Sequence, residues 1–124
     1  MITENDTAYQ ISAASVRFGP GVTREVGLDL CDLGARRTLV LIDPALRALP
    51  VGEVVVEALQ AAHVSFEVFD RIAVEPTDRS FLEAIQAATA DEFDSFVAVG
   101  GGSTIDTAKA ANLYSTYPPI SWTT

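Results

Sequence analysis

A glycine-rich turn gives the strongest chemical signal in the sequence. Gly100, Gly101 and Gly102 are followed by Ser103 and Thr104, between an apolar run and an alanine-rich segment. Glycines let a backbone approach a diphosphate with no Cβ in the way, and free N–H groups at a helix start present partial positive charge. The turn therefore predicts an anion-binding site, although three glycines could also serve only a tight turn and close helix packing. It matches neither the G-x-G-x-x-G fingerprint nor the phosphate-binding loop with its lysine and hydroxyl.

Two aspartates could support this site. Asp43 follows the apolar run 38–42 and precedes Pro44. A carboxylate at the end of an early strand can accept hydrogen bonds from both ribose hydroxyls, and its charge disfavours a 2′-phosphate. A simple Asp-Pro turn is the structural alternative. Asp106 stands three residues after Ser103, which predicts that Ser103 caps a helix and that Asp106 completes a variant capping box.

The elements that must position these residues alternate along the chain. Apolar runs at 38–42, 65–69 and 95–99 predict strands, and apolar residues at helical spacing predict helices at 22–33, 51–62, 81–88 and 103–114. Gly34 is expected in the left-handed C-cap of the first helix. Residues 9–18 predict an extended edge segment. Alternation with long crossovers implies parallel pairing and right-handed connections, hence a Rossmann-like, three-layer α/β domain with a mostly parallel sheet.

Length and charge limit the number of domains and the classes of binding partner that we expect. A chain of 124 residues suffices for one domain, so residues 1–124 are expected to form a single unit. Seventeen acidic against eight basic residues give a formal net charge of −9, which repels phosphate backbones and anionic membranes. No apolar run approaches the ~18 residues of a membrane helix. We therefore expect no nucleic-acid partner and no membrane partner.

The first residues, the single cysteine and the single histidine add further expectations. Residues 1–6 are acidic and polar, unlike a secretory or mitochondrial leader, so a cytoplasmic location is predicted. The single cysteine, Cys31, lies in a helical apolar pattern and is expected to be a buried structural thiol. The single histidine, His63, cannot by itself build a metal site, and it falls at an expected helix end.

The segment 96–114 resembles the signature of the iron-containing alcohol dehydrogenase family, through the pattern GGGS-x-x-D-x-A-K. Segments 18–21, 41–44 and 74–78 are similar to that family in order and spacing, so the resemblance covers about residues 9–119. Within it, Glu-Pro-Thr-Asp at 75–78 and Lys-Ala-Ala-Asn-Leu-Tyr at 109–114 are most similar to the hydroxyacid-oxoacid transhydrogenase branch. Residues 120–124 are unlike the family's continuation and are expected to be a divergent tail.

The resemblance implies an N-terminal domain that binds NAD. It places Gly101, Gly102, Ser103 and Thr104 at the pyrophosphate and Asp43 at the adenosine ribose. In that family a helical second domain supplies an aspartate and three histidines that hold iron or zinc, which polarises the alcohol oxygen while hydride passes to nicotinamide. None of those metal positions is found in this sequence, so the metal-binding domain is expected to be absent and no catalytic or metal-ligating residue is predicted.

The expected function is that of the NAD-binding domain of an alcohol dehydrogenase or hydroxyacid-oxoacid transhydrogenase, which acts on a small alcohol or hydroxy acid and is inactive as this chain alone. One alternative is an inactive, truncated remnant or interaction module that keeps the fold and forms a homo-oligomer through exposed apolar surface. Another is a domain for a different phosphorylated ligand, because a glycine turn at a helix start does not select among phosphates.

Overall fold

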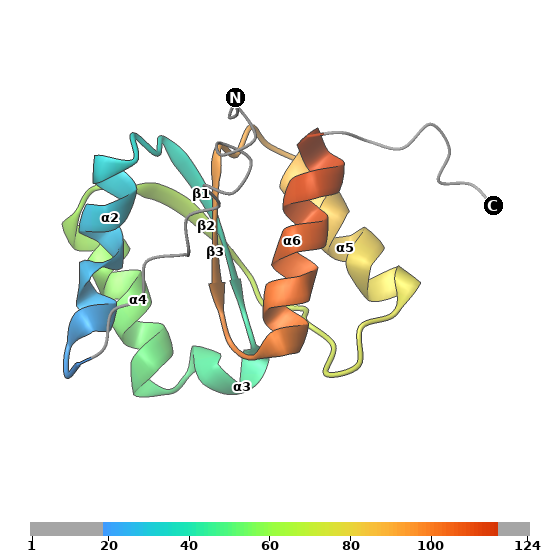
Figure 1. Ribbon diagram of the computed structural model, residues 1–124, viewed down its shortest axis with the longest axis horizontal. Coiled ribbons are helices and arrows are strands. Elements are labelled where there is room, and N and C mark those ends of the chain that lie inside the picture. Colours follow the sequence, from blue (N-terminus) through green and yellow to red (C-terminus); the bar gives the residue numbers. More distant parts are fainter. Residues whose placement is uncertain (1–18, 117–124) are drawn as a thin grey trace, which may run out of the picture.

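Three short apolar runs form the parallel sheet of the computed structural model, which describes residues 19–116 (Figure 1). The strands are Arg37–Ile42 (β1), Ser65–Phe69 (β2) and Ser95–Val99 (β3), in the order β2-β1-β3. Val40 of β1 lies beside Val68 of β2 and Val97 of β3. Because β1 is central and covered on both faces, its residues from Thr38 to Ile42 are all buried, which explains its unbroken apolar pattern.

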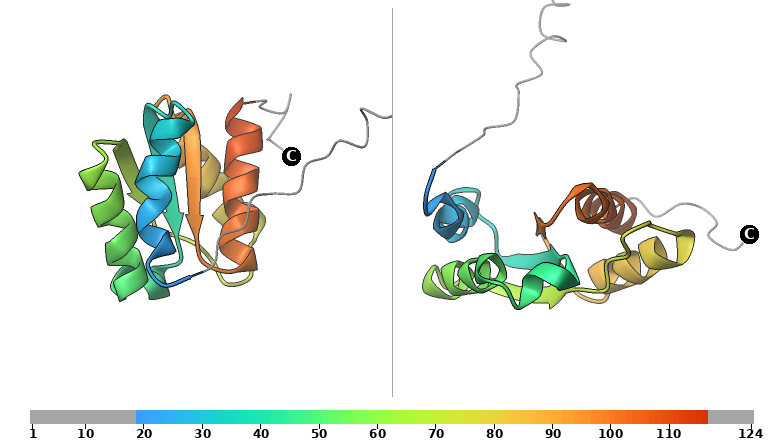
Figure 2. Two further views of the ribbon diagram at one scale, coloured as in Figure 1. Left: turned by 60° about the vertical axis from the view of Figure 1, so that its left-hand side comes forward. Right: turned by 90° about the horizontal axis from the view of Figure 1, so that it is seen from below.

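Helices cover both faces of the sheet and make three layers, as expected (Figure 2). A 3₁₀ turn, Val22–Glu25 (η1), leads into Val26–Asp32 (α2), which packs with Pro50–Ala61 (α4) on one face. The other face carries Asp78–Thr89 (α5) and Gly102–Thr116 (α6). A short helix, Pro44–Arg47 (α3), lies between β1 and α4. No helix of the described residues 19–116 is long and apolar enough to cross a membrane.

The two cores come from opposite sides of each strand. Val40 and Ile42 point toward α2 and α4, while Leu39 and Leu41 point toward α5 and α6. Small side chains at Ala84 of α5 and Ala111 of α6 are fully buried, so these two helices lie close together. The hydrophobic period of the sequence therefore predicts which face each strand residue covers.

The first helix differs from its predicted form. Its α-helical part ends at Asp32, so Leu33 leaves the apolar stripe and is 81% exposed, although Gly34 does adopt the expected left-handed conformation, with φ 78°. The expectation for Cys31 is wrong. This residue is exposed, because it lies in the last turn of α2, where Sγ is 3.6 Å from the carbonyl oxygen of Ala62 at the end of α4.

The start of α5 and the two terminal segments were also predicted from the sequence. Helix α5 begins at Asp78, three residues before the predicted apolar stripe 81–88, and its cap is Thr77, which exchanges hydrogen bonds with Ser80. The extended segment predicted at residues 9–18 and the tail at 120–124 lie outside the described residues.

A polar network joins the amino ends of the strands. The carboxylate of Asp94 accepts hydrogen bonds from the backbone N–H groups of Arg36 and Arg37, at 3.0–3.1 Å. The Arg37 guanidinium bridges Glu67 of β2 and Asp91, which follows α5. This network fixes the start of β1 between its two neighbours, at the end of the sheet opposite to the candidate site.

Candidate functional site

The candidate site lies where β1 and β3 end side by side (Figure 1). After β1 the chain moves to β2 on one side, and after β2 it crosses to β3 on the other side. Strand order reverses at this position, and open α/β sheets bind ligands in the crevice outside the carboxyl ends of the strands at such a point. The sequence placed the glycine turn at a strand end but could not show this reversal, because strand order depends on tertiary pairing.

Asp43 sits at the end of β1 and is held by two backbone contacts. Its N–H donates to the carbonyl oxygen of Val99 at 2.9 Å, and its Oδ1 accepts a hydrogen bond from the N–H of Ala45 at 2.8 Å. The carboxylate thus caps α3, which is the role that the Asp-Pro turn alternative describes. No described residue donates to Oδ2, so this oxygen is available to a ligand hydroxyl at the crevice.

Gly100 is required by packing. A Cβ at this position would lie 2.8 Å from the Cβ of Thr104 and 3.2 Å from the Cβ of Asp43. Such distances are too short for a side chain to fit without a shift of its neighbours. Gly100 therefore brings the turn directly against Asp43, and close packing explains this one of the three glycines.

Gly101 and Gly102 differ from Gly100. A Cβ at either position would meet no atom within 4 Å, and neither residue has a positive φ. Neither close packing nor backbone conformation therefore explains why glycine stands there. The open space beside both residues fits a group that lies against the backbone, as a diphosphate does.

Helix α6 presents its free amides to this open space. The helix begins at Gly102, and the N–H of Ile105 donates to the carbonyl oxygen of Gly101 at 3.0 Å. The first four N–H groups of a helix have no acceptor inside it, and here they belong to residues 101–104. The predicted cap is wrong: Gly101 occupies the cap position, and Ser103 lies inside the first turn.

Thr104 contributes differently from its neighbours. Its side chain is fully buried under the turn, and Oγ1 has no hydrogen-bond partner among the described residues. Its N–H still belongs to the set of free amides, so only the backbone of Thr104 can face a ligand. Ser103 is half-buried, and its carbonyl oxygen accepts a hydrogen bond from Thr107 Oγ1 at 2.7 Å.

The five predicted binding residues thus meet at the carboxyl ends of the strands. Asp43 follows β1, and residues 101–104 follow β3. The described residues, 19–116, contain no group of three or more histidine, cysteine, aspartate or glutamate side chains that could hold a metal ion.

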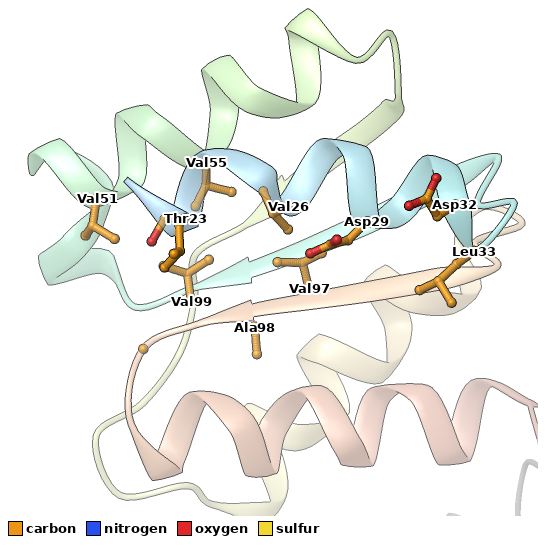
Figure 3. A pocket seen from close by; sticks show the side chains of 12 residues that line it. Thr23, Val26, Asp29, Asp32, Leu33, Val51, Val55, Val97, Ala98 and Val99 are labelled. Atoms are coloured by element: carbon orange, nitrogen blue, oxygen red, sulfur yellow. The ribbon is translucent and has the colours of Figure 1, made fainter. Parts of the chain in front are cut away.

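Sequence reasoning missed a groove that starts at the carboxyl end of β3 (Figure 3). It has a volume of about 730 Å³ and runs from Gly100 along β3, facing α2 and α4. Val26, Val55 and Val97 form part of its apolar lining, and Asp29 and Asp32 lie on the α2 side. The groove depends on how α2 crosses β3, so no local pattern could reveal it.

Proteins of known function are similar in sequence to this chain over most of its length. Hydroxyacid-oxoacid transhydrogenase of Bos taurus, a mitochondrial protein, is 49% identical over 113 residues, which are 91% of this chain and 24% of that protein. The human transhydrogenase, also mitochondrial, is 46% identical over 113 residues, which are again 91% of this chain and 24% of that protein. The chain spans about a quarter of the length of these relatives. Their location does not support the predicted cytoplasmic one, which stays untested for this chain.

Solved structures share the fold. An iron-containing alcohol dehydrogenase from Thermotoga maritima superposes with a TM-score of 0.78 at 27% identity, over 87% of this chain and 30% of that one. The NADH-dependent butanol dehydrogenase A of the same organism gives a TM-score of 0.77 at 23% identity, over 87% and 29%. The sequence model of the iron-containing alcohol dehydrogenases matches residues 13–123. This match covers most of the sequence, and the chain belongs to the iron-containing alcohol dehydrogenase family.

Proposed function

We propose that the carboxyl ends of β1 and β3, together with the turns that follow them, bind NAD(H). The free amides of residues 101–104 hold the diphosphate, and Oδ2 of Asp43, to which no residue of 19–116 donates, accepts a hydrogen bond from a hydroxyl of the adenosine ribose. The observation that carries this proposal is the open space beside Gly101 and Gly102, at the start of a 15-residue helix and at the point where strand order reverses.

Electrostatics supports a site built from the backbone. The chain has a formal net charge of −9, and Lys109 is its only lysine. Lys109 is exposed and lies on α6, two turns beyond the glycines. Oriented N–H groups and the dipole of α6 can therefore hold an anionic cofactor without a lysine at the turn.

The role of this chain in an oxidoreductase reaction follows from the same site. Members of the family are oxidoreductases, and we propose that this domain holds the cofactor for the oxidation of an alcohol or hydroxy acid. The described residues offer no ligand set for iron or zinc, so we derive no metal-dependent step from them. The domain orients the dinucleotide and selects between NAD and NADP through Asp43.

Titration calorimetry with NADH tests the binding. We expect saturable heat for the unmodified chain, and we expect Gly102→Val to weaken binding at least about tenfold, or 1.4 kcal/mol, because its side chain fills the space of the diphosphate. Ala61→Val, at an exposed position of α4 remote from the site, is the matched control. Absence of heat at millimolar NADH would remove the proposal. Equal affinity for inorganic phosphate would instead indicate a general phosphate site.

A further inference from the structure

An ion pair joins the segments that follow β1 and β2. Nη1 of Arg47, the last residue of α3, lies 2.6 Å from Oδ2 of Asp70, which directly follows β2. Helix α3 lies at the carboxyl ends of the strands (Figure 1). Arg47 forms no second ion pair within residues 19–116, so a single carboxylate holds its guanidinium in place.

This ion pair lies next to Asp43. The register of the sheet places Asp70 level with the last residue of β1, one before Asp43. Adjacent strands are about 5 Å apart. Arg47 follows Asp43 by four residues on the short helix that Asp43 caps, which is a rise of about 6 Å along the helix axis. Two carboxylates therefore follow neighbouring strand ends, and one guanidinium contacts the second of them.

The strand order indicates which part of a dinucleotide reaches this ion pair. In the proposed site the diphosphate lies at residues 101–104, after β3, and the adenosine ribose lies at Asp43, after β1. Because the order is β2-β1-β3, the end of β2 lies beyond Asp43 as seen from the diphosphate. Groups that project from the ribose on that side, among them the 2′ substituent, therefore approach Arg47 and Asp70.

We propose that the Arg47–Asp70 ion pair favours NAD over NADP at this site, an inference that rests on the proposed binding of the dinucleotide. NADP differs from NAD by a phosphate on the 2′-hydroxyl of the adenosine ribose. An arginine near the ribose can accommodate that phosphate, because its planar fork of donors matches phosphate oxygens. Asp70 neutralises Arg47 and occupies its donors. The charge of Asp43 therefore repels a 2′-phosphate without an opposing free cation.

The ion pair is exposed enough to rearrange. The side chains of Arg47 and Asp70 are 50% and 37% exposed, and an ion pair in contact with water contributes little to folding stability. Removal of the Asp70 charge should therefore leave the fold intact and release the guanidinium. The neighbouring Arg71 is bound differently, because its guanidinium lies over the ring of Phe69, 4.7 Å from the ring centre. Arg47 is thus the cation that the loss of Asp70 sets free.

Titration calorimetry of Asp70→Asn with NADH and with NADPH tests this inference. We expect the affinity for NADPH to rise about tenfold, as one unit of charge near a phosphate produces in a partly exposed site, while the affinity for NADH changes little. Asp91→Asn is the matched control. It also removes a carboxylate that is paired with an arginine, Arg37, but at the opposite end of the sheet, so the ratio of the two affinities should stay that of the unmodified chain.

Arg47→Gln identifies the cation. In combination with Asp70→Asn it should abolish the gain in NADPH affinity, and alone it should weaken NADPH binding, because Asp70 then lacks its counter-charge. An unchanged ratio of the two affinities in Asp70→Asn would overturn the inference. Equal gains for both cofactors would also overturn it, since they would indicate a general effect of charge on the diphosphate. Absence of NADH binding to the unmodified chain, by contrast, would remove the proposed function and this inference with it.

Discussion

The backbone of Gly100 packs directly against the side chain of Thr104: a Cβ on Gly100 would lie 2.8 Å from the Cβ of Thr104. We therefore expect Gly100→Ala to lower the free energy of unfolding by about 1–3 kcal/mol, as overpacking does. Gly102→Ala should raise it by up to about 1 kcal/mol, because alanine is the better helix residue and has open space there. Urea unfolding of the two variants measures both effects, and equal losses would contradict this division of the glycines.

We expect the buried hydroxyl of Thr104 to lower the stability of the fold. Oγ1 is shielded from solvent and has no hydrogen-bond partner among residues 19–116. Thr104→Val removes the polar atom and keeps the shape, so we expect a gain of about 1 kcal/mol in the free energy of unfolding. Thr104→Ser, which retains the hydroxyl, should show no gain. NADH affinity should not change in the valine variant if only the backbone N–H contacts the cofactor, and calorimetry on the same sample tests this.

Asp43 combines a structural and a proposed binding role, which two variants separate. Asn is as good a cap as Asp, so Asp43→Asn should keep the contact with Ala45 and leave the free energy of unfolding within about 0.5 kcal/mol. Asp43→Ala removes the cap and should cost about 1 kcal/mol. The asparagine variant should also lose about tenfold or more of the preference for NADH over NADPH, since a close like charge is removed. Parallel calorimetry with both cofactors measures the ratio. An unchanged ratio would exclude Asp43 from the ribose site.

Sequence reasoning located the core elements well because each has one dominant local signal. The run 38–42 is apolar throughout since β1 is central, and the strand at 95–99 was predicted with the observed bounds. Helix ends were less predictable. Ser103 has the usual chemistry of a cap, yet the helix begins two residues earlier than such a cap requires, because Gly100 packs against Thr104 and leaves Gly101 in the cap position.

The residues of the candidate site could be named from the sequence, but their separate structural roles could not. Residue types and the family resemblance point to Asp43 and residues 101–104, and the structure brings these residues together at the carboxyl ends of β1 and β3. Their separate roles depend on tertiary distances that no spacing encodes: Gly100 is close-packed, Gly102 is open, and the Thr104 side chain is buried. The groove along β3 escaped prediction for the same reason.

Cys31 provides a simple check on the position of α2. The thiol is exposed in the last turn of the helix, near the carbonyl oxygen of Ala62. We expect it to react with a thiol reagent such as dithionitrobenzoate in native buffer, at a rate similar to that of the urea-unfolded chain. The Cys31→Ser variant supplies the blank. Reaction only after unfolding would show that the thiol is buried, as the helical pattern alone had suggested.

The network at the amino ends of the strands should make stability depend on acid pH. Hydrogen bonds from the backbone N–H groups of Arg37 and Arg36 hold the pKa of Asp94 below its ordinary value of 3.8. The backbone N–H of Glu92 and the Arg37 side chain likewise lower the pKa of Asp91. A carboxylate with a lowered pKa in the folded state stabilises the fold fully above its unfolded pKa, and this contribution is lost as pH falls through the folded pKa.

We therefore expect the melting temperature of the chain to be independent of these groups above about pH 5 and to fall as the pH drops below about 4. Asp94→Asn can no longer form the charge-assisted contacts, so it should melt lower at neutral pH and show a smaller decline between pH 5 and 2. Glu57→Gln, at an exposed position in α4, should reproduce the profile of the unmodified chain. Calorimetric melting at intervals across this range measures all three profiles. If Asp94→Asn and the unmodified chain declined in parallel, the contacts of Asp94 with the start of β1 would not contribute to acid sensitivity.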